Sequence, residues 1–293
     1  MSFLQASQTK KIMISACTAT DIEDVLQLDV SRVRKDAFQW ELPVDVEKCA
    51  PSKWFRQAMT MLQPWNSNSD ATTRTKIDIF LLDVTAHANK KSENDSGIGC
   101  WGEMSLSACR DGTQLNGRGG YFLGYGRGEG GKSLHTLLIA GEAKARGASM
   151  NIWQIIAYCG IIHNIRKTRP ESPNSTVYGF ITDGAVWEFV RIDNDGKVWT
   201  SAPKTNETEV ETWLAYLIHC ARRCTPSATP TSSLSVLYHA ELDPFEAVVE
   251  KFITLPEING PQDDDNCTDD DDCTDDEEEA VAFRNRFDEL MKL

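Results

Sequence analysis

No stretch of the 293-residue chain approaches the roughly 20 consecutive apolar residues that a membrane-spanning helix needs, so we expect no membrane partner. Residues 1–11 also lack the apolar segment of a secretory signal. The nine cysteines are odd in number and scattered, which is typical of reduced thiols rather than of a disulfide framework. These absences predict an intracellular protein, and they are compatible with a nuclear location.

An excess of basic residues is absent as well, because the formal net charge is −14. The negative charge is concentrated in residues 241–293, which contain 19 acidic and 4 basic side chains. Subtracting these from the totals of 44 and 30 leaves 25 acidic and 26 basic side chains in residues 1–240. Since that body is nearly neutral, the acidity of the whole chain does not exclude a polyanionic partner. The acidic tail itself is suited to a basic protein partner.

Apolar periodicity and turn residues divide the body into expected helices and strands. A capping box at Thr20–Glu23 predicts a first helix that runs to about Lys35. Further helices are expected at Ser52–Leu62, Asn151–Lys167 and Glu207–Arg223. Strands are expected at Lys76–Val84, Thr136–Lys144, Val177–Ile181, Val186–Ile192 and Lys197–Thr200, the last three joined by Asp-Gly turns.

Glycine and acidic residues mark the irregular parts of the chain. Residues 97–133 contain 12 of the 19 glycines, which favours a long loop or a loosely paired hairpin. After a Ser/Thr/Pro-rich link at 225–233 and a small element at 234–255, residues 256–279 are expected to form a disordered acidic tail. A short helix is expected at 280–293. The sequence therefore predicts one domain over residues 1–255, followed by the tail.

Charged residues end the otherwise apolar strand at 136–144. Side chains two apart on a strand share a face, so Glu142 and Lys144 stand together while Ala143 points to the other side. The next helix places Gln154 and Tyr158 four residues apart, on one face. Burying such groups is costly unless they pair or bind something. A structural ion pair and a binding site are both open at this point.

These residues together resemble the PD-(D/E)xK, or restriction-endonuclease-like, nuclease superfamily over residues 75–192. Ile77-Asp78 is similar to its first acidic position, Glu142-Ala143-Lys144 to its E-x-K tripeptide, and Gln154 with Tyr158 to the Q-x-x-x-Y element of the RecB-like branch. The resemblance implies an α/β fold with a central mixed sheet flanked by helices, in which residues 97–133 form a glycine-rich insertion. It also implies that the five residues Asp78, Glu142, Lys144, Gln154 and Tyr158 form the catalytic site.

The resemblance further implies a Mg²⁺-dependent nuclease, with Mn²⁺ as a substitute metal. Asp78, Glu142 and a backbone carbonyl near Ala143 would hold the metal through hard oxygen ligands. The substrate would be nucleic acid, with DNA favoured over RNA. Asp78 precedes Glu142 by 64 residues, so Asp83, Glu103 and Glu129 compete as the first acid. An early acidic residue, Glu41 or Glu47, is a further candidate ligand.

Two other classes of function stay open. Residues 126–133, Gly-Arg-Gly-Glu-Gly-Gly-Lys-Ser, match the phosphate-binding P-loop pattern. A P-loop needs a helix that begins at Lys132-Ser133, but the following residues have the composition of a strand. The chain is alternatively a nucleic-acid-binding or chromatin-binding module that is derived from a nuclease fold and does not cleave. Metal-dependent cleavage separates this module from an enzyme.

Overall fold

The computed structural model describes residues 10–65, 69–90, 97–125, 137–168 and 174–224. Residues 126–133 and the expected segments beyond residue 224, including the acidic tail and the 280–293 helix, lie outside these ranges. The described helices are α1 (Ala19–Leu26), α2 (Lys53–Leu62), α3 (Asp70–Lys90), α4 (Ile152–Lys167) and α5 (Glu207–Cys224). The described strands are β1 (Lys10–Met13), β2 (Ile98–Arg110), β3 (Thr113–Tyr125), β4 (Leu137–Ala143), β5 (Val177–Thr182), β6 (Trp187–Ile192) and β7 (Val198–Thr200).

The strands form one mixed sheet with the order β1-β3-β4-β5-β6-β7, and β2 pairs with the other edge of β3. The pairs β1–β3 and β4–β5 are parallel, and the remaining pairs are antiparallel. Helix α4 connects the parallel strands β4 and β5, as a crossover between parallel neighbours requires. The predicted α/β class with a mixed sheet flanked by helices is confirmed.

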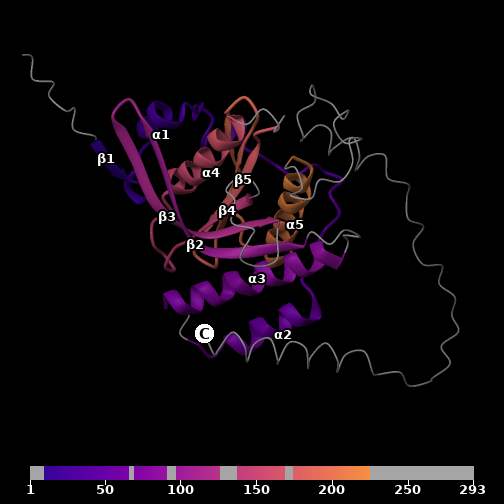
Figure 1. Cartoon of the computed structure of the whole chain (residues 1–293). Helices are drawn as coiled ribbons and strands as arrows, with labels where there is room; N and C mark the ends of the chain where they lie inside the picture. The colour runs from indigo at the N-terminus through magenta and orange to yellow at the C-terminus, as the bar shows by residue number, and fades with distance from the viewer. Residues whose placement is uncertain (1–9, 66–68, 91–96, 126–136, 169–173, 225–293) are drawn as a thin grey trace, which may run out of the picture. The chain divides into compact units, whose positions relative to one another are not determined.

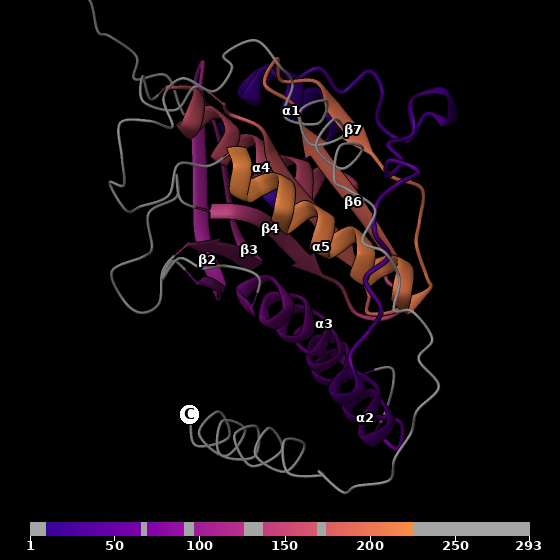
Figure 2. The same cartoon turned by 90° about the vertical axis from the view of Figure 1, so that its right-hand side faces the viewer.

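Helices cover both faces of this sheet (Figures 1 and 2). On one face, residues of α1 and α4 pack with alternate strand residues such as Phe122, Ala140 and Ile181. On the other face, α3 and α5 pack with the intervening residues, such as Tyr121, Ile139 and Phe180, and α2 packs on α3. The alternation of strand side chains thus creates two apolar cores. A side chain packed on the α4 side therefore lies in a different core from one packed on the α3 side.

Of the two forms expected for residues 97–133, a long loop or a hairpin, the described part adopts the hairpin. Residues 98–125 form a long, regular hairpin, β2–β3, and β3 lies inside the sheet. Glycine is needed there because other elements approach closely: a Cβ on Gly117 would lie 2.7 Å from Ile14 Cβ and 3.0 Å from the Tyr158 hydroxyl. The glycine at 117 therefore lets η1 (Ile14–Ala16) and α4 pack closely on the sheet, and it does not mark a loop.

The strand expected at Lys76–Val84 is also wrong, because these residues lie inside helix α3. The buried residues Ile77, Phe80, Leu81 and Val84 follow the i, i+3, i+4, i+7 spacing of one helix face. Leu82 on the other side is 45% exposed. A short window that is rich in apolar residues does not separate a strand from a helix, and the polar residues that extend α3 on both sides decide the outcome.

Other predicted elements are confirmed, with shifted ends. Helix α1 is shorter than expected, and its capping box uses Thr18 and Asp21 rather than Thr20 and Glu23. Ser52 caps α2 by accepting the Phe55 N–H. The expected strands of the 177–200 region form antiparallel pairs, and α4, with residues such as Ile155 and Ile162 fully buried, lies inside the protein as its composition predicts. No described helix is both long enough and apolar enough to span a bilayer.

Candidate functional site

The end of β4 brings Glu142 and Lys144 together, as the strand alternation predicts. Lys144 Nζ lies 3.2 Å from Glu142 Oε1. Ala143 between them packs in the opposite core, with α3 and α5. The backbone N–H of Lys144 donates to Thr182 O at 2.8 Å. That bond extends the pairing of β4 with β5 by one residue and fixes the backbone of Lys144 at the end of β4.

Helix α4 supplies the rest of this cluster. Lys144 Nζ donates to Gln154 Oε1, and Gln154 Nε2 lies 3.3 Å from the Tyr158 hydroxyl. The hydroxyl in turn donates to Arg118 O on β3 at 2.9 Å. Glu142, Lys144, Gln154 and Tyr158 therefore form one continuous hydrogen-bonded chain, which we call the β4–α4 cluster. Four of the five predicted site residues meet here.

Glu142 is the most constrained member of the β4–α4 cluster. The residue is 8% exposed, and its Oε2 atom makes no hydrogen bond within the described chain. Burial raises the pKa of its carboxyl, while Lys144, the nearby N–H of Gly120 and Arg74 oppose that shift. Gly120 lies beside the free oxygen, since a Cβ there would be 3.9 Å from Oε2. A buried carboxylate oxygen without a donor is a position where a cation or a proton is stabilised.

Asp78 does not join the β4–α4 cluster, in contrast to its predicted place on a neighbouring strand. It lies on α3, which covers the opposite face of the sheet. The side chain of Asp78 is accessible to solvent. Desolvation by the protein around it nevertheless raises the pKa of its carboxyl, while a hydrogen bond with Tyr121 and the charge of Arg74 lower it. Arg74 is the one group that acts on both Asp78 and Glu142 in these effects. Asp78, the predicted first acid of the metal site, is therefore not placed beside Glu142.

Two of the competing acids have other partners. Asp83, also on α3, accepts hydrogen bonds from the N–H and the hydroxyl of Ser52 and so holds the start of α2. Glu103 lies in β2, with φ 49°, opposite the Gly120 position of β3. Its carboxylate lies 2.6 Å from Arg118 Nη2. Because Gly120 lies beside Glu142, Glu103 is close to the β4–α4 cluster. Its carboxylate is already paired with Arg118, however.

The remaining candidate acids are distributed elsewhere. Glu129 lies outside the described residues. Glu41 Oε2 is 3.6 Å from Lys204 Nζ, near the start of α5. Glu47 lies in the segment before α2. None of the described candidates brings a second carboxylate into contact with Glu142.

Among the acidic residues predicted to bind magnesium, Glu142 has a carboxylate oxygen without a hydrogen bond in the described chain. No group of three or more His, Cys, Asp or Glu side chains in the described ranges is arranged to hold a metal. The free Oε2 of Glu142 and the backbone carbonyl of Ala143 are hard oxygen ligands, however. Mg²⁺ commonly uses one or two carboxylates and completes its shell with waters and substrate phosphates. Glu142 with Ala143 fits that arrangement, and Asp78 does not.

The P-loop interpretation of residues 126–133 concerns residues outside the described ranges, but its downstream neighbour is described. Strand β4 begins at Leu137. The P-loop mechanism requires a helix directly after Lys132-Ser133, whose N-terminus faces the phosphates. The first described element after Ser133 is thus a strand, which begins four residues later.

One ion pair on the same face of the sheet as Glu142 escaped the sequence analysis. Arg34 Nε and Nη2 donate to the two carboxylate oxygens of Glu188 on β6, at 3.0 and 2.8 Å. Arg34 Nη2 also donates to Met150 O, just before α4, at 3.2 Å. The only sequence signal is the isolated charge of Glu188 between Trp187 and Phe189. Nothing in the sequence pairs it with Arg34, because the contact joins segments that are far apart in the chain.

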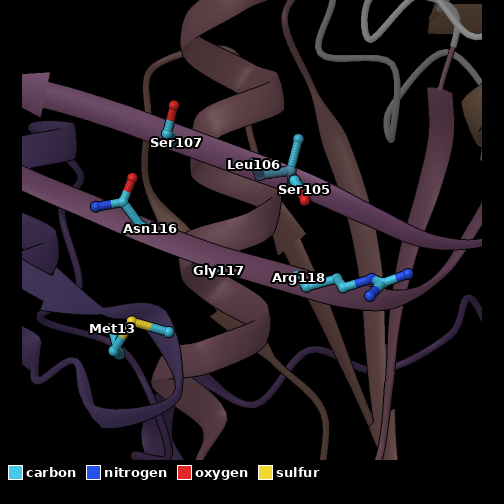
Figure 3. A pocket seen from close by; sticks show the side chains of 7 residues that line it. All are labelled: Met13, Ser105, Leu106, Ser107, Asn116, Gly117 and Arg118. Atoms are coloured by element: carbon cyan, nitrogen blue, oxygen red, sulfur yellow. The ribbon is translucent and has the colours of Figure 1, made fainter.

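A shallow hollow lies on the hairpin near the β4–α4 cluster (Figure 3). It is lined by Ser105, Leu106 and Ser107 of β2, by Asn116, Gly117 and Arg118 of β3, and by Met13 of β1. Met13 is 61% exposed. Arg118 is shared with the cluster, because its backbone oxygen binds Tyr158.

The comparisons with known proteins do not place the chain in a family. No protein-family model matches it, and no curated protein matches it significantly.

Proposed function

We propose that the protein is a Mg²⁺-dependent nuclease of the PD-(D/E)xK type that acts on DNA in preference to RNA, with the β4–α4 cluster as its active site. The observation that carries this proposal is the hydrogen-bonded chain from Glu142 through Lys144 and Gln154 to Tyr158. The cluster contains a buried anion and a cation side by side at the end of a strand. The Oε2 atom of Glu142 makes no hydrogen bond in the described chain, which supports a ligand at this position.

Each side chain has a distinct role in this proposal. Glu142, with the carbonyl of Ala143, would hold the metal through its free oxygen. Lys144 would offset the negative charge that develops on the phosphate as the phosphodiester bond breaks. Gln154 fixes the lysine ammonium, and Tyr158 fixes Gln154 through its anchor on Arg118 O. When bound, Mg²⁺ would supply polarisation of a phosphate oxygen and a lowered pKa for an attacking water.

A second function is favoured by the position of Asp78. Its separation from Glu142 by the sheet is expected of a nuclease-derived module that binds nucleic acid without cutting it. In that case Glu142 and Lys144 would be a retained ion pair, and Arg74, Arg118 and Lys144 would serve binding alone. The two functions differ in one measurable property, which is cleavage.

Incubation of the purified chain with labelled DNA and RNA tests the proposal. We expect Mg²⁺ or Mn²⁺ to permit cleavage of DNA and EDTA to stop it, because Glu142 alone does not polarise the phosphate. Retention of DNA in a binding assay with no cleavage under either metal would establish the non-cleaving module instead. If the chain neither binds nor cleaves nucleic acid, both functions are refuted.

The acidic tail leads to a second prediction. Residues 257–293, with 15 acidic and 3 basic side chains, would compete with phosphate at a high effective concentration. Truncation after Pro256 should therefore tighten DNA binding at low salt, and the difference should shrink as salt rises. Fluorescence anisotropy of both proteins over a salt series measures it. Equal affinities at low salt would show that the tail serves another partner, such as a basic protein.

A further inference from the structure

We propose that Arg34 is a second phosphate-binding residue, which holds the nucleic-acid backbone beside the phosphate at Lys144. This inference rests on the proposed function and extends it by naming part of the substrate path. It begins from the sheet register. Glu142 on β4 pairs with Ile181 on β5, which pairs with Glu188 on β6. Paired residues share a face of the sheet, so the Arg34–Glu188 pair lies on the same face as the β4–α4 cluster.

The register also sets the separation between the two cationic groups. Two strand spacings separate Glu142 from Glu188, which is roughly 9–10 Å. The start of α4 lies between the groups: Arg34 binds Met150 O, just before the helix, and Lys144 binds Gln154 in its first turn. A single phosphate does not span this separation. Arg34 would therefore contact a different phosphate of the same strand.

Arg34 is held in a defined orientation, and some of its guanidinium N–H groups make no hydrogen bond in the described chain. A guanidinium has five N–H donors, and the bonds to Glu188 and Met150 use Nε and both hydrogens of Nη2. Nη1 makes no hydrogen bond in the described chain. The Arg34 side chain is 47% exposed, whereas that of Glu188 is 7% exposed. The buried carboxylate thus fixes the arginine and leaves one edge of its planar fork for a phosphate.

The backbone of Arg34 supports a functional role. Its φ is 52°, in the left-handed region that a non-glycine residue adopts at a cost. The Arg34 N–H donates to Thr200 Oγ1 at 3.0 Å, which holds this conformation. The strained backbone thus holds the guanidinium against the buried Glu188 carboxylate, with one edge left toward solvent.

Salt-dependent binding tests the inference. We expect Arg34→Ala to weaken DNA binding several-fold at low salt and to reduce the slope of log affinity against log salt by about 1, the value for one phosphate contact. Arg34→Lys should keep the slope, because it keeps the charge, but bind more weakly than the wild type. Glu188→Gln should tighten binding, because it removes the negative charge that offsets Arg34.

The matched control is Arg32→Ala. Arg32 carries the same charge two residues away, but it binds Asp29 and lies over the Phe38 and Trp199 rings. Its loss should leave the slope unchanged. A structural role for Arg34 predicts that Arg34→Ala and Glu188→Gln both lower the thermal stability and that neither changes the slope. That result, with wild-type binding intact, overturns the inference alone, whereas a wild type that binds no DNA overturns the proposed function as well.

Discussion

Glu142→Gln should reduce metal-dependent DNA cleavage by about 10³-fold or more, the size of loss typical when a group that stabilises transition-state charge is removed. The substitution keeps the shape of the side chain but removes the anion that the free Oε2 would offer to a metal. Lys144→Ala should cause a loss of similar size. The affinity for DNA should change far less, since Arg34 and the other basic residues remain. Single-turnover cleavage and anisotropy measure the two effects separately.

Asp78→Asn is the matched control for Glu142→Gln. It makes the same chemical change on a carboxylate whose pKa is raised by the surrounding protein, but on the other face of the sheet. We expect it to retain most of the activity. If Asp78→Asn abolishes cleavage and Glu142→Gln does not, the β4–α4 cluster is not the active site. Loss of activity in both would mean that α3 moves toward Glu142 when substrate binds.

Glu211→Gln should stabilise the protein, and increasingly so as the pH rises. Glu211 on α5 is fully buried, and neither of its carboxylate oxygens has a hydrogen-bond partner in the described chain. Burial, followed by the charges of Asp83 and Glu207, raises its pKa from 4.5 to about 9. The folded state therefore binds this proton more tightly than the unfolded state, and stability falls as the pH rises between these two values.

The size of the effect follows from the same shift. At pH 7 the unfolded carboxyl is ionised while the folded one is protonated, which costs on the order of 3 kcal/mol of unfolding free energy at 1.36 kcal/mol per pH unit. Urea unfolding at pH 5 and pH 8 should show a strong pH dependence in the wild type and a weaker one in Glu211→Gln. Glu209→Gln is the control, because Glu209 lies on the same helix but pairs with Lys204 at 2.9 Å. Parallel pH profiles for wild type and Glu211→Gln would contradict the prediction.

The β4–α4 cluster was predictable because its chemistry is local in sequence. Strand alternation places Glu142 beside Lys144, and helical spacing places Gln154 beside Tyr158. A single crossover then brings the two pairs together. The metal function assigned to them stays a prediction, since the geometry alone does not test it.

The parts that sequence reasoning missed depend on contacts between distant segments. The Lys76–Val84 run satisfies both a strand and a helix pattern, and only its continuation to Asp70 and Lys90 selects the helix. The glycines of β3 have the composition of a loop, and their role becomes visible only when Ile14 and Tyr158 approach Gly117. The Arg34–Glu188 pair likewise has no local signal. Tertiary packing determines all three.

The continuity of the β4–α4 cluster has a consequence for the order of folding. All four of its side chains come from one stretch, residues 142–158, so the chain closes only short loops to bring them together. Strand β1 instead pairs with β3 through Lys10 and Thr113, which requires a much longer loop. The cluster should therefore assemble early and open late. In native-state hydrogen exchange, the amides of β4, α4 and β5 should be protected longest, while those of β1 exchange by local opening.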